Sequence, residues 1–195
     1  MVREFIYFSS KARTSGNFKD LMKAGRMDIV CNVIIHAFFI SNAIRDDVKL
    51  HLVFYGPPTP PRHIIFNSKI KNVISKKDIS GLIKRMLFKY KEGKKTEIFP
   101  GCFIEKKSFF KVIEEMLREK KKIYVLDKDG EDIRSLKKEE LENSVFILGS
   151  EEGLPKKELK RLKNKTRKIS VGNKTYFSSQ TIVLVHNELD RRIIS

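Results

Sequence analysis

Short runs of β-branched and aromatic residues recur along this chain, and most are followed by a turn and then by a helical pattern. Three of them come in series in the C-terminal half: KIYVLD (122–127), VFILG (145–149) and RKISV (167–171). Each is followed by a short segment that contains Gly, a residue typical of turns: KDG (128–130), SEEG (150–153) and GN (172–173). Strands that alternate with helices pair in parallel and are buried on both faces. The pattern therefore predicts an α/β fold with a mainly parallel sheet flanked by helices.

The same reading predicts the other elements. We expect further strands at 3–8, 48–55, 63–66 and 98–104, the last interrupted by Pro100-Gly101. We expect helices at 27–44, 79–90 and 109–117, a short basic helix after Pro155, and a terminal helix from Ser178 or Ser179. Four prolines within 57–61 predict a stiff loop between two strands. A chain of 195 residues is the size of one ordinary domain, so we expect a single domain over 1–195.

Nothing in the sequence indicates a metal site, an export signal or a membrane span. Cys31 and Cys102 lie in apolar contexts and read as core residues in a reducing compartment, and the four histidines lack metal-ligand spacing. The N-terminus has no apolar stretch before a cleavage site. The longest apolar run, 27–44, is interrupted by five polar residues and reads as a buried helix. We expect a cytoplasmic protein without a metal.

The charge is strongly unbalanced. Forty-one Lys and Arg residues face 24 Asp and Glu residues, which gives a formal net charge of +17. A positive field of this size attracts polyanions, and nucleic acid is the commonest of these. The alternative is a lysine-rich surface of the heat-adapted kind, but heat adaptation enriches Glu together with Lys.

Three strand ends in the C-terminal half are the candidates for a ligand site. In open α/β sheets, ligands bind just beyond the carboxyl ends of strands. Here those ends are 126–127, 148–150 and 171–173, and Gly149 and Gly172 permit close backbone approach at two of them. The chain has no G-x-G-x-x-G and no G-x-x-x-x-G-K-[ST], so the common dinucleotide and P-loop sites are excluded. No nucleophile elbow is present either.

The C-terminal half resembles the SPOUT methyltransferases. The resemblance rests on YVLD, then FILG with Gly153 four residues after Gly149, then KIS, a variable loop and TIVLVHNELDRR. It implies that the last strands and helix form a trefoil knot, a topology that is otherwise almost absent from proteins. It also implies that the knot loops bind S-adenosylmethionine (SAM), mostly through backbone groups.

The N-terminal half narrows this resemblance. REFIYF, GRMDIVC and YGPPTPP are similar to the archaeal TrmY family, whose members methylate N1 of pseudouridine at position 54 in the T-loop of tRNA. The resemblance covers nearly the whole chain. The related Nep1 type, which methylates pseudouridine in ribosomal RNA, remains an alternative. A non-enzymatic RNA-binding module is a third possibility, supported by charge alone.

The resemblance assigns residues to the cofactor site. They are Leu126, Leu148, Gly149, Ile169, Val171, Gly172, Lys174, Thr175, Tyr176 and Thr181. Judged without the resemblance, Leu126, Leu148, Ile169 and Val171 would read as ordinary sheet core, and the two glycines as ordinary turns. Methyl transfer to a ring nitrogen requires mainly that the donor and the acceptor are held in line.

For the RNA base we expect Arg26, Asp28 and Tyr55, with the proline loop 57–61 beside them. Tyr55 either stacks on an extruded base or is a half-buried strand residue. The basic segments KKDISGLIKR, REKKKIYV and PKKELKRLKNK are candidates for contacts with the tRNA backbone. By the same resemblance we expect a homodimer, with helix 27–44 and the terminal helix as candidate interface, although burial within one subunit explains helix 27–44 equally well.

Overall fold

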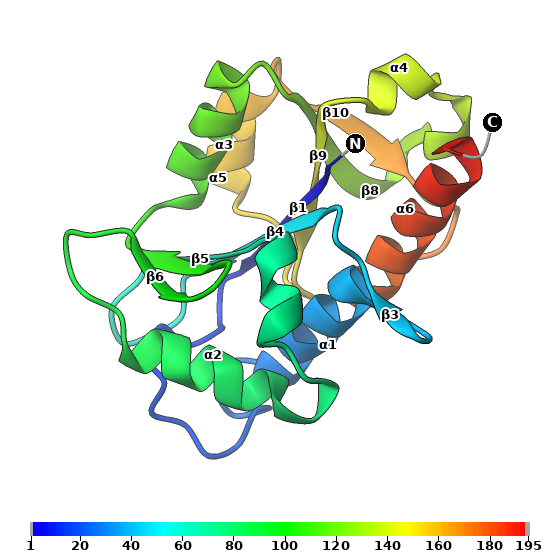
Figure 1. Ribbon diagram of the computed structural model, residues 1–195. Helices are drawn as coiled ribbons and strands as arrows, with labels where there is room; N and C mark the ends of the chain where they lie inside the picture. The colour runs from blue at the N-terminus through cyan, green and yellow to red at the C-terminus, as the bar shows by residue number, and fades with distance from the viewer. Residues whose placement is uncertain (1, 194–195) are drawn as a thin grey trace.

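An eight-stranded sheet forms the centre of the molecule (Figure 1). The structure is a computed structural model that describes residues 2–193, apart from the side chains of Asn72 and Ile193. The strands are β1 (Arg3–Ser9), β4 (Val48–Phe54), β5 (Arg62–Phe66), β6 (Thr96–Phe99), β7 (Cys102–Glu105), β8 (Lys122–Asp132), β9 (Ser144–Gly149) and β10 (Arg167–Ser170), in the order β10-β8-β9-β1-β4-β5-β7-β6. Neighbours from β10 to β4 pair in parallel, and β5, β7 and β6 add an antiparallel extension. The predicted mainly parallel α/β fold is confirmed.

Helices cover both faces of the sheet (Figure 1). On one face lie α1 (Met27–Phe38), α2 (Ile79–Phe88) and α6 (Ser178–Ile193), with the small α4 (Lys138–Leu141) and the 3₁₀ turns η1 (Ser68–Asn72), η2 (Lys76–Asp78) and η3 (Ile133–Ser135). On the other face lie α3 (Phe109–Arg118) and α5 (Lys156–Leu162). Ser108 caps α3 by accepting a hydrogen bond from the Lys111 backbone N–H at 3.3 Å, which satisfies one free donor of the first turn.

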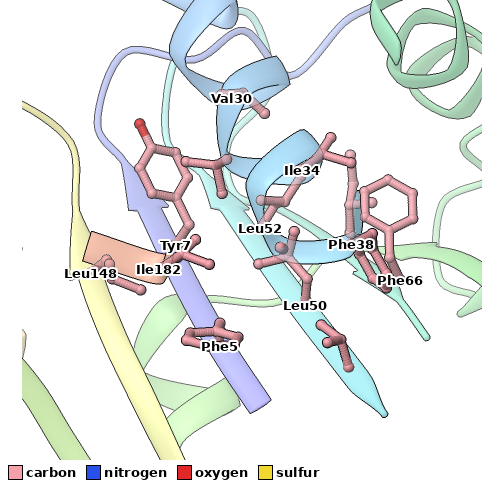
Figure 2. Close-up of a cluster of buried hydrophobic side chains, with 14 of the residues drawn as sticks. Phe5, Tyr7, Val30, Ile34, Phe38, Leu50, Leu52, Phe66, Leu148 and Ile182 are labelled. Carbon is pink, nitrogen blue, oxygen red and sulfur yellow. The ribbon is translucent and has the colours of Figure 1, made fainter. Parts of the chain in front are cut away.

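The central strand β1 shows why the sheet is buried on both sides. Phe5 and Tyr7 point to the α1 and α6 face, while Ile6 and Phe8 point to the α3 and α5 face, as the two-residue period of a strand requires. Figure 2 shows Phe5 and Tyr7 beside Ile182 of α6 and Leu148 of β9. These four side chains are at most 3% exposed, and Ile6 and Phe8 on the opposite face are at most 2% exposed. A separate core therefore packs against each face of the sheet.

A buried polar ladder crosses four strands on the α3 side. Glu4 Oε1 lies 2.8 Å from His51 Nε2, His51 Nδ1 lies 2.9 Å from His63 Nε2, and His63 Nδ1 lies 3.0 Å from Glu105 Oε1. The four residues come from β1, β4, β5 and β7. The ladder therefore joins the parallel half of the sheet to its antiparallel extension.

Two predicted elements differ from the structure. The helix expected over 27–44 ends at Phe38, and residues 39–44 form a small hairpin of β2 (Phe39–Ile40) and β3 (Ala43–Ile44), because Ser41-Asn42 is a turn sequence. The strand expected over 122–127 continues to Asp132. Lys168 of β10 pairs with Val125, but the next residue pairs with Glu131, so residues 126–130 bulge out of the ladder.

The remaining predicted boundaries agree with the structure to within a few residues. The segment expected at 98–104 is a hairpin of β6 and β7, which turns at Pro100-Gly101. Cys31 and Cys102 are both free cysteines. Within residues 2–193, no helix combines the length and the apolar character that a bilayer crossing requires.

Candidate cofactor site

A cavity of about 820 Å³ lies at the carboxyl ends of β8, β9 and β10. This is the position at which open α/β sheets bind ligands, and its volume is in the usual range for small-molecule sites. Three segments form most of its wall: the bulge of β8, the turn after β9 and the loop between β10 and α6. The sheet topology thus brings together the three strand ends that the sequence pointed to.

Nine of the ten residues expected to bind the cofactor line this cavity. They are Leu126, Leu148, Gly149, Val171, Gly172, Lys174, Thr175, Tyr176 and Thr181. Ile169 does not. It is fully buried in the sheet core, while its neighbours Lys168 and Ser170 line the cavity. Successive side chains of a strand point to opposite sides, so the side chain of Ile169 belongs to the core and not to the cavity wall.

Glycines set the shape of the turn after β9. A Cβ atom on Gly149 would lie 2.7 Å from the backbone carbon of Gly153, which is closer than real Cβ contacts allow. The Gly153 N–H donates to the Ser150 carbonyl at 2.8 Å, and Gly153 has φ +77°. Any larger residue at Gly149 would therefore move the turn that walls the cavity.

The loop after β10 is fixed at both ends. Ser170 Oγ accepts from the Gly172 N–H at 3.1 Å and donates to the Gly172 carbonyl at 2.7 Å. At the other end, Ser178 Oγ donates to the Gly149 carbonyl at 2.6 Å, which holds the start of α6 against the end of β9. The cavity wall is thus built on backbone that side chains hold in place.

The lining suits a ligand with apolar and polar parts. Apolar side chains of Ile29, Leu126, Leu148, Leu154, Leu159 and Val171 face it. Backbone groups at the glycine turns supply hydrogen-bonding partners. One ion pair lies in the wall: Lys168 Nζ is 2.6 Å from Asp127 Oδ2, and this lowers the pKa of the Asp127 carboxyl. Within residues 2–193, no group of three or more His, Cys, Asp or Glu side chains is arranged to hold a metal ion.

Arg26 and Asp28 form a rigid pair next to the cavity. Arg26 adopts a left-handed conformation with φ 60° before α1, and its guanidinium donates to both carboxylate oxygens of Asp28 at 3.1 and 2.9 Å. That pairing lowers the pKa of Asp28. The pKa of Arg26 is raised, first by Asp28 and to a smaller extent by Glu151, which lines the cavity. Ile29, the residue after Asp28, is also in the lining, so the pair lies at the edge of the cavity.

Tyr55 lies apart from this pair. It is not among the cavity-lining residues, and its ring packs edge-on against Phe8 with centroids 5.0 Å apart. Its hydroxyl donates to Glu158 Oε1 at 2.9 Å and accepts from the Phe109 backbone N–H at 3.0 Å. Burial, the largest cause, raises its pKa to about 12. Both the ring and the hydroxyl are therefore occupied between α3 and α5.

Several lining residues were not expected from the sequence. Ile29 comes from α1, Leu159 and Lys163 from α5 and its end, and Glu151 and Leu154 from the turn after β9. The turn residues directly follow a strand end, so the rule that located Gly149 extends to them. Ile29 and Leu159 carry no such local signal, because tertiary packing alone brings α1 and α5 to this edge.

The chain has the fold of the SPOUT methyltransferases. The structure of Archaeoglobus fulgidus Nep1 bound to S-adenosylhomocysteine superposes with a TM-score of 0.67, with 12% identity and 100% of both chains covered. The SpoU methyltransferase AviRb from Streptomyces viridochromogenes, in complex with AdoMet, gives a TM-score of 0.53 with 11% identity and covers 100% of this chain and 60% of that one. At these identities the similarity establishes the fold.

The chain belongs to the family whose model is described as "Putative SAM-dependent RNA methyltransferase", which matches residues 2–194. Three relatives carry the name tRNA (pseudouridine(54)-N(1))-methyltransferase. The protein from Methanocaldococcus jannaschii is 34% identical, with 99% of this chain and 98% of the relative covered. The protein from Methanococcus aeolicus is 39% identical (96% and 97% covered), and that from Pyrococcus abyssi is 31% identical (97% and 98% covered).

Proposed function

We propose that this protein transfers the methyl group of SAM to N1 of the pseudouridine at position 54 in the T-loop of tRNA. The observation that carries the proposal is the cavity at the ends of β8, β9 and β10, found in a chain that matches relatives of this name over nearly its whole length. A binding module that only held RNA would have no use for such a cavity. Charge alone supports that alternative.

The residues of this chain would act by positioning. SAM, when bound, supplies an activated methyl group. Leu126, Leu148 and Val171 would pack against its apolar parts, and the turns at Gly149 and Gly172 would supply backbone hydrogen bonds. Pseudouridine is joined to its ribose through C5, so its N1 carries a proton and is the methyl acceptor. As the N–CH3 bond forms and the S–CH3 bond breaks, this proton would leave to solvent. Holding that nitrogen in line with the methyl group is the main requirement of the reaction.

Arg26 and Asp28 are our candidates for orienting the base. They lie at the edge of the cavity, and the bidentate bond between them holds the carboxylate in one orientation. Because Arg26 lowers the pKa of Asp28, that carboxylate is ionised at neutral pH and able to accept a hydrogen bond from an N–H of the base. Tyr55 is a weaker candidate, since its hydroxyl already has two partners.

We further propose a single knotted domain over 1–195 that acts as a homodimer in the cytoplasm. The path of the chain supports the knot. β10 lies at the edge of the sheet beside β8, yet Ser178, at the start of the next helix, is hydrogen-bonded to the end of β9.

The exposure of apolar side chains supports the dimer, because Tyr176, Phe177 and Val183 are 39%, 68% and 44% exposed around the start of α6. Light scattering after size-exclusion chromatography tests the dimer: a monomeric mass would contradict it.

Methylation of matched tRNAs tests the reaction. One tRNA carries pseudouridine at position 54, and its control carries uridine there, whose N1 is bonded to ribose and cannot accept a methyl group. With SAM, mass mapping should show one added methyl group at position 54 of the first tRNA alone. A methyl group at another position, or on a ribosomal RNA fragment offered in parallel, would overturn the assignment of the substrate.

A further inference from the structure

The basic helix α5 and the turn after it differ from the other basic segments of the chain. Residues 156–165 contain six cations, and five of them, Lys156, Lys157, Lys160, Lys163 and Lys165, form no ion pair, hydrogen bond through the side chain, or aromatic contact within residues 2–193. All five are exposed. The sixth, Arg161, lies over the Phe110 ring at 4.0 Å.

In the two other segments expected to contact RNA, five of the eight cations are engaged inside the protein, against one of six in residues 156–165. In KKDISGLIKR, Lys76 and Lys84 lie over aromatic rings and Arg85 pairs with Asp78. In REKKKIYV, Lys121 pairs with Glu4, and Lys122 donates to the Glu139 carbonyl. A cation that already has an intramolecular partner gains less from a phosphate. The structure therefore singles out α5 among the three segments.

The orientation of α5 turns its lysines toward solvent beside the cavity. At 3.6 residues per turn, Lys156, Lys160 and Lys163 share one face of the helix, with Lys157 next to it. Leu159 lines the cavity and Leu162 is fully buried, while Glu158 and Arg161 face α3 through Tyr55 and Phe110. Lys163 itself reaches the cavity lining. The lysine face thus begins at the cavity and runs outward along α5.

We propose that this lysine face, made of Lys156, Lys157, Lys160 and Lys163, binds the phosphate backbone of the RNA strand that carries the target nucleotide. The inference rests on the proposed function and adds to it the surface that aligns the substrate. Lysines one turn apart along a helix lie about 5–6 Å apart, so their long side chains can reach neighbouring phosphates of one strand. Unpaired ammonium groups give up only solvent and counterions on binding.

An anionic lipid surface is the competing partner for such a helix. Interfacial helices combine a basic face with exposed apolar side chains that enter the acyl boundary. Both leucines of α5 are instead turned inward, toward the cavity and the core. Within α5 itself no apolar side chain is exposed beside the lysines, which fits a phosphate backbone.

Two triple variants with the same loss of charge test the proposal. The first replaces Lys156, Lys157 and Lys160 by Ala. The control replaces Lys77, Lys91 and Lys94 by Ala, three exposed lysines without ion pairs in the described structure, which lie near α2 and β6 on the far side of the sheet. A third variant, with Arg at 156, 157 and 160, keeps the charge. Circular dichroism and the Kd for S-adenosylhomocysteine show whether the fold and the cavity are intact.

The measurements are the Kd for unmodified tRNA, its dependence on salt, and binding to vesicles of anionic lipid. For the first variant we expect the Kd for tRNA to rise at least about tenfold, and the slope of log K against log salt to fall by about two to three, since each lost phosphate contact removes about 0.7–0.9. The control and the arginine variant should bind tRNA like the parent, and all four proteins should bind S-adenosylhomocysteine alike.

Three results would overturn the proposal: tRNA affinity unchanged in the first variant, an equal loss in the control, or a loss of binding to anionic vesicles without a loss of binding to tRNA. None of these depends on methylation being observed. Conversely, if tRNA binds through this face but no methyl group appears at position 54, the docking surface stands and the proposed reaction fails.

Discussion

At the scale of single residues, the structure separates side chains that lie near the cavity from side chains that hold the scaffold around it. Arg26 and Asp28 are fixed to each other at the cavity edge. Tyr55 and His186 are fixed inside the packing between elements. Residues of the second kind should change stability when mutated and leave methyl transfer by the folded protein intact.

Tyr55 tests this separation. Tyr55→Phe removes the donor to Glu158 and the acceptor for the Phe109 N–H, so we expect the free energy of unfolding to fall by about 1–3 kcal/mol. The turnover number of the folded enzyme should not change. Tyr176→Phe is the control, because in the part of the chain that the structure describes the Tyr176 hydroxyl forms no hydrogen bond. Urea unfolding without ligand measures both variants. A tenfold lower kcat for Tyr55→Phe at unchanged stability would instead place Tyr55 at the base.

His186 should make the protein sensitive to mild acid. It accepts from Arg3 Nη1 at 3.2 Å through Nδ1 and donates to the Ala37 carbonyl at 3.0 Å through Nε2, so the neutral ring satisfies both partners. Burial, followed by Arg45 and Arg3, lowers its pKa to about 3, and Asp190 opposes this shift. The unfolded chain binds a proton below about pH 6.5 while the folded one does not.

Stability should therefore fall as the pH drops from 6.5 toward 3, by at most about 1.4 kcal/mol per pH unit from this group. His186→Gln keeps a donor and an acceptor but does not titrate. Its free energy of unfolding should depend less steeply on pH over this range than that of the parent. Equal slopes for the two proteins would show that His186 is charged in the folded state or does not contribute.

At the scale of secondary-structure elements, the strand ends determine the cavity. Alternating apolar runs and turn residues are local signals, so the strands and most helices could be predicted to within a few residues. The bulge of β8 could not be predicted, because it depends on the pairing of Glu131 with Ile169 of β10. It also depends on Gly130, where a Cβ atom would lie 2.6 Å from the Ile169 backbone. Long-range contacts of this kind leave no periodic pattern in one strand.

The turn after β9 offers a direct test at this scale. Gly149→Ala places a methyl group against the Gly153 backbone, so the turn must move and the cavity must change shape. We expect the Kd for S-adenosylhomocysteine, measured by calorimetry, to rise at least about tenfold, which is about 1.4 kcal/mol. Gly93→Ala is the control: it strains a glycine with φ +73° that does not line the cavity, so it can lower stability but should leave this Kd unchanged. An unchanged Kd for Gly149→Ala would mean that the turn does not shape the ligand site.

At the scale of the whole molecule, two properties combine: a strong positive charge and a cavity at one end of the sheet. The charge was evident from composition, and the cavity position followed from the order of strands and turns. Only the packed structure shows which lysines lack an intramolecular partner. It alone also shows that α1 and α5 reach the cavity. Ile29 and Leu159 lie far from the strand ends in sequence, and nothing local marks them.

The central claim is that the crevice at the ends of β8, β9 and β10 holds the methyl donor. A crystal structure of the protein with S-adenosylhomocysteine tests it most directly. We expect the ligand between Leu126, Gly149 and Gly172, with its sulfur directed toward Arg26 and Asp28. Ligand density in a different part of the molecule, or side chains filling this crevice while the ligand is bound, would contradict the account.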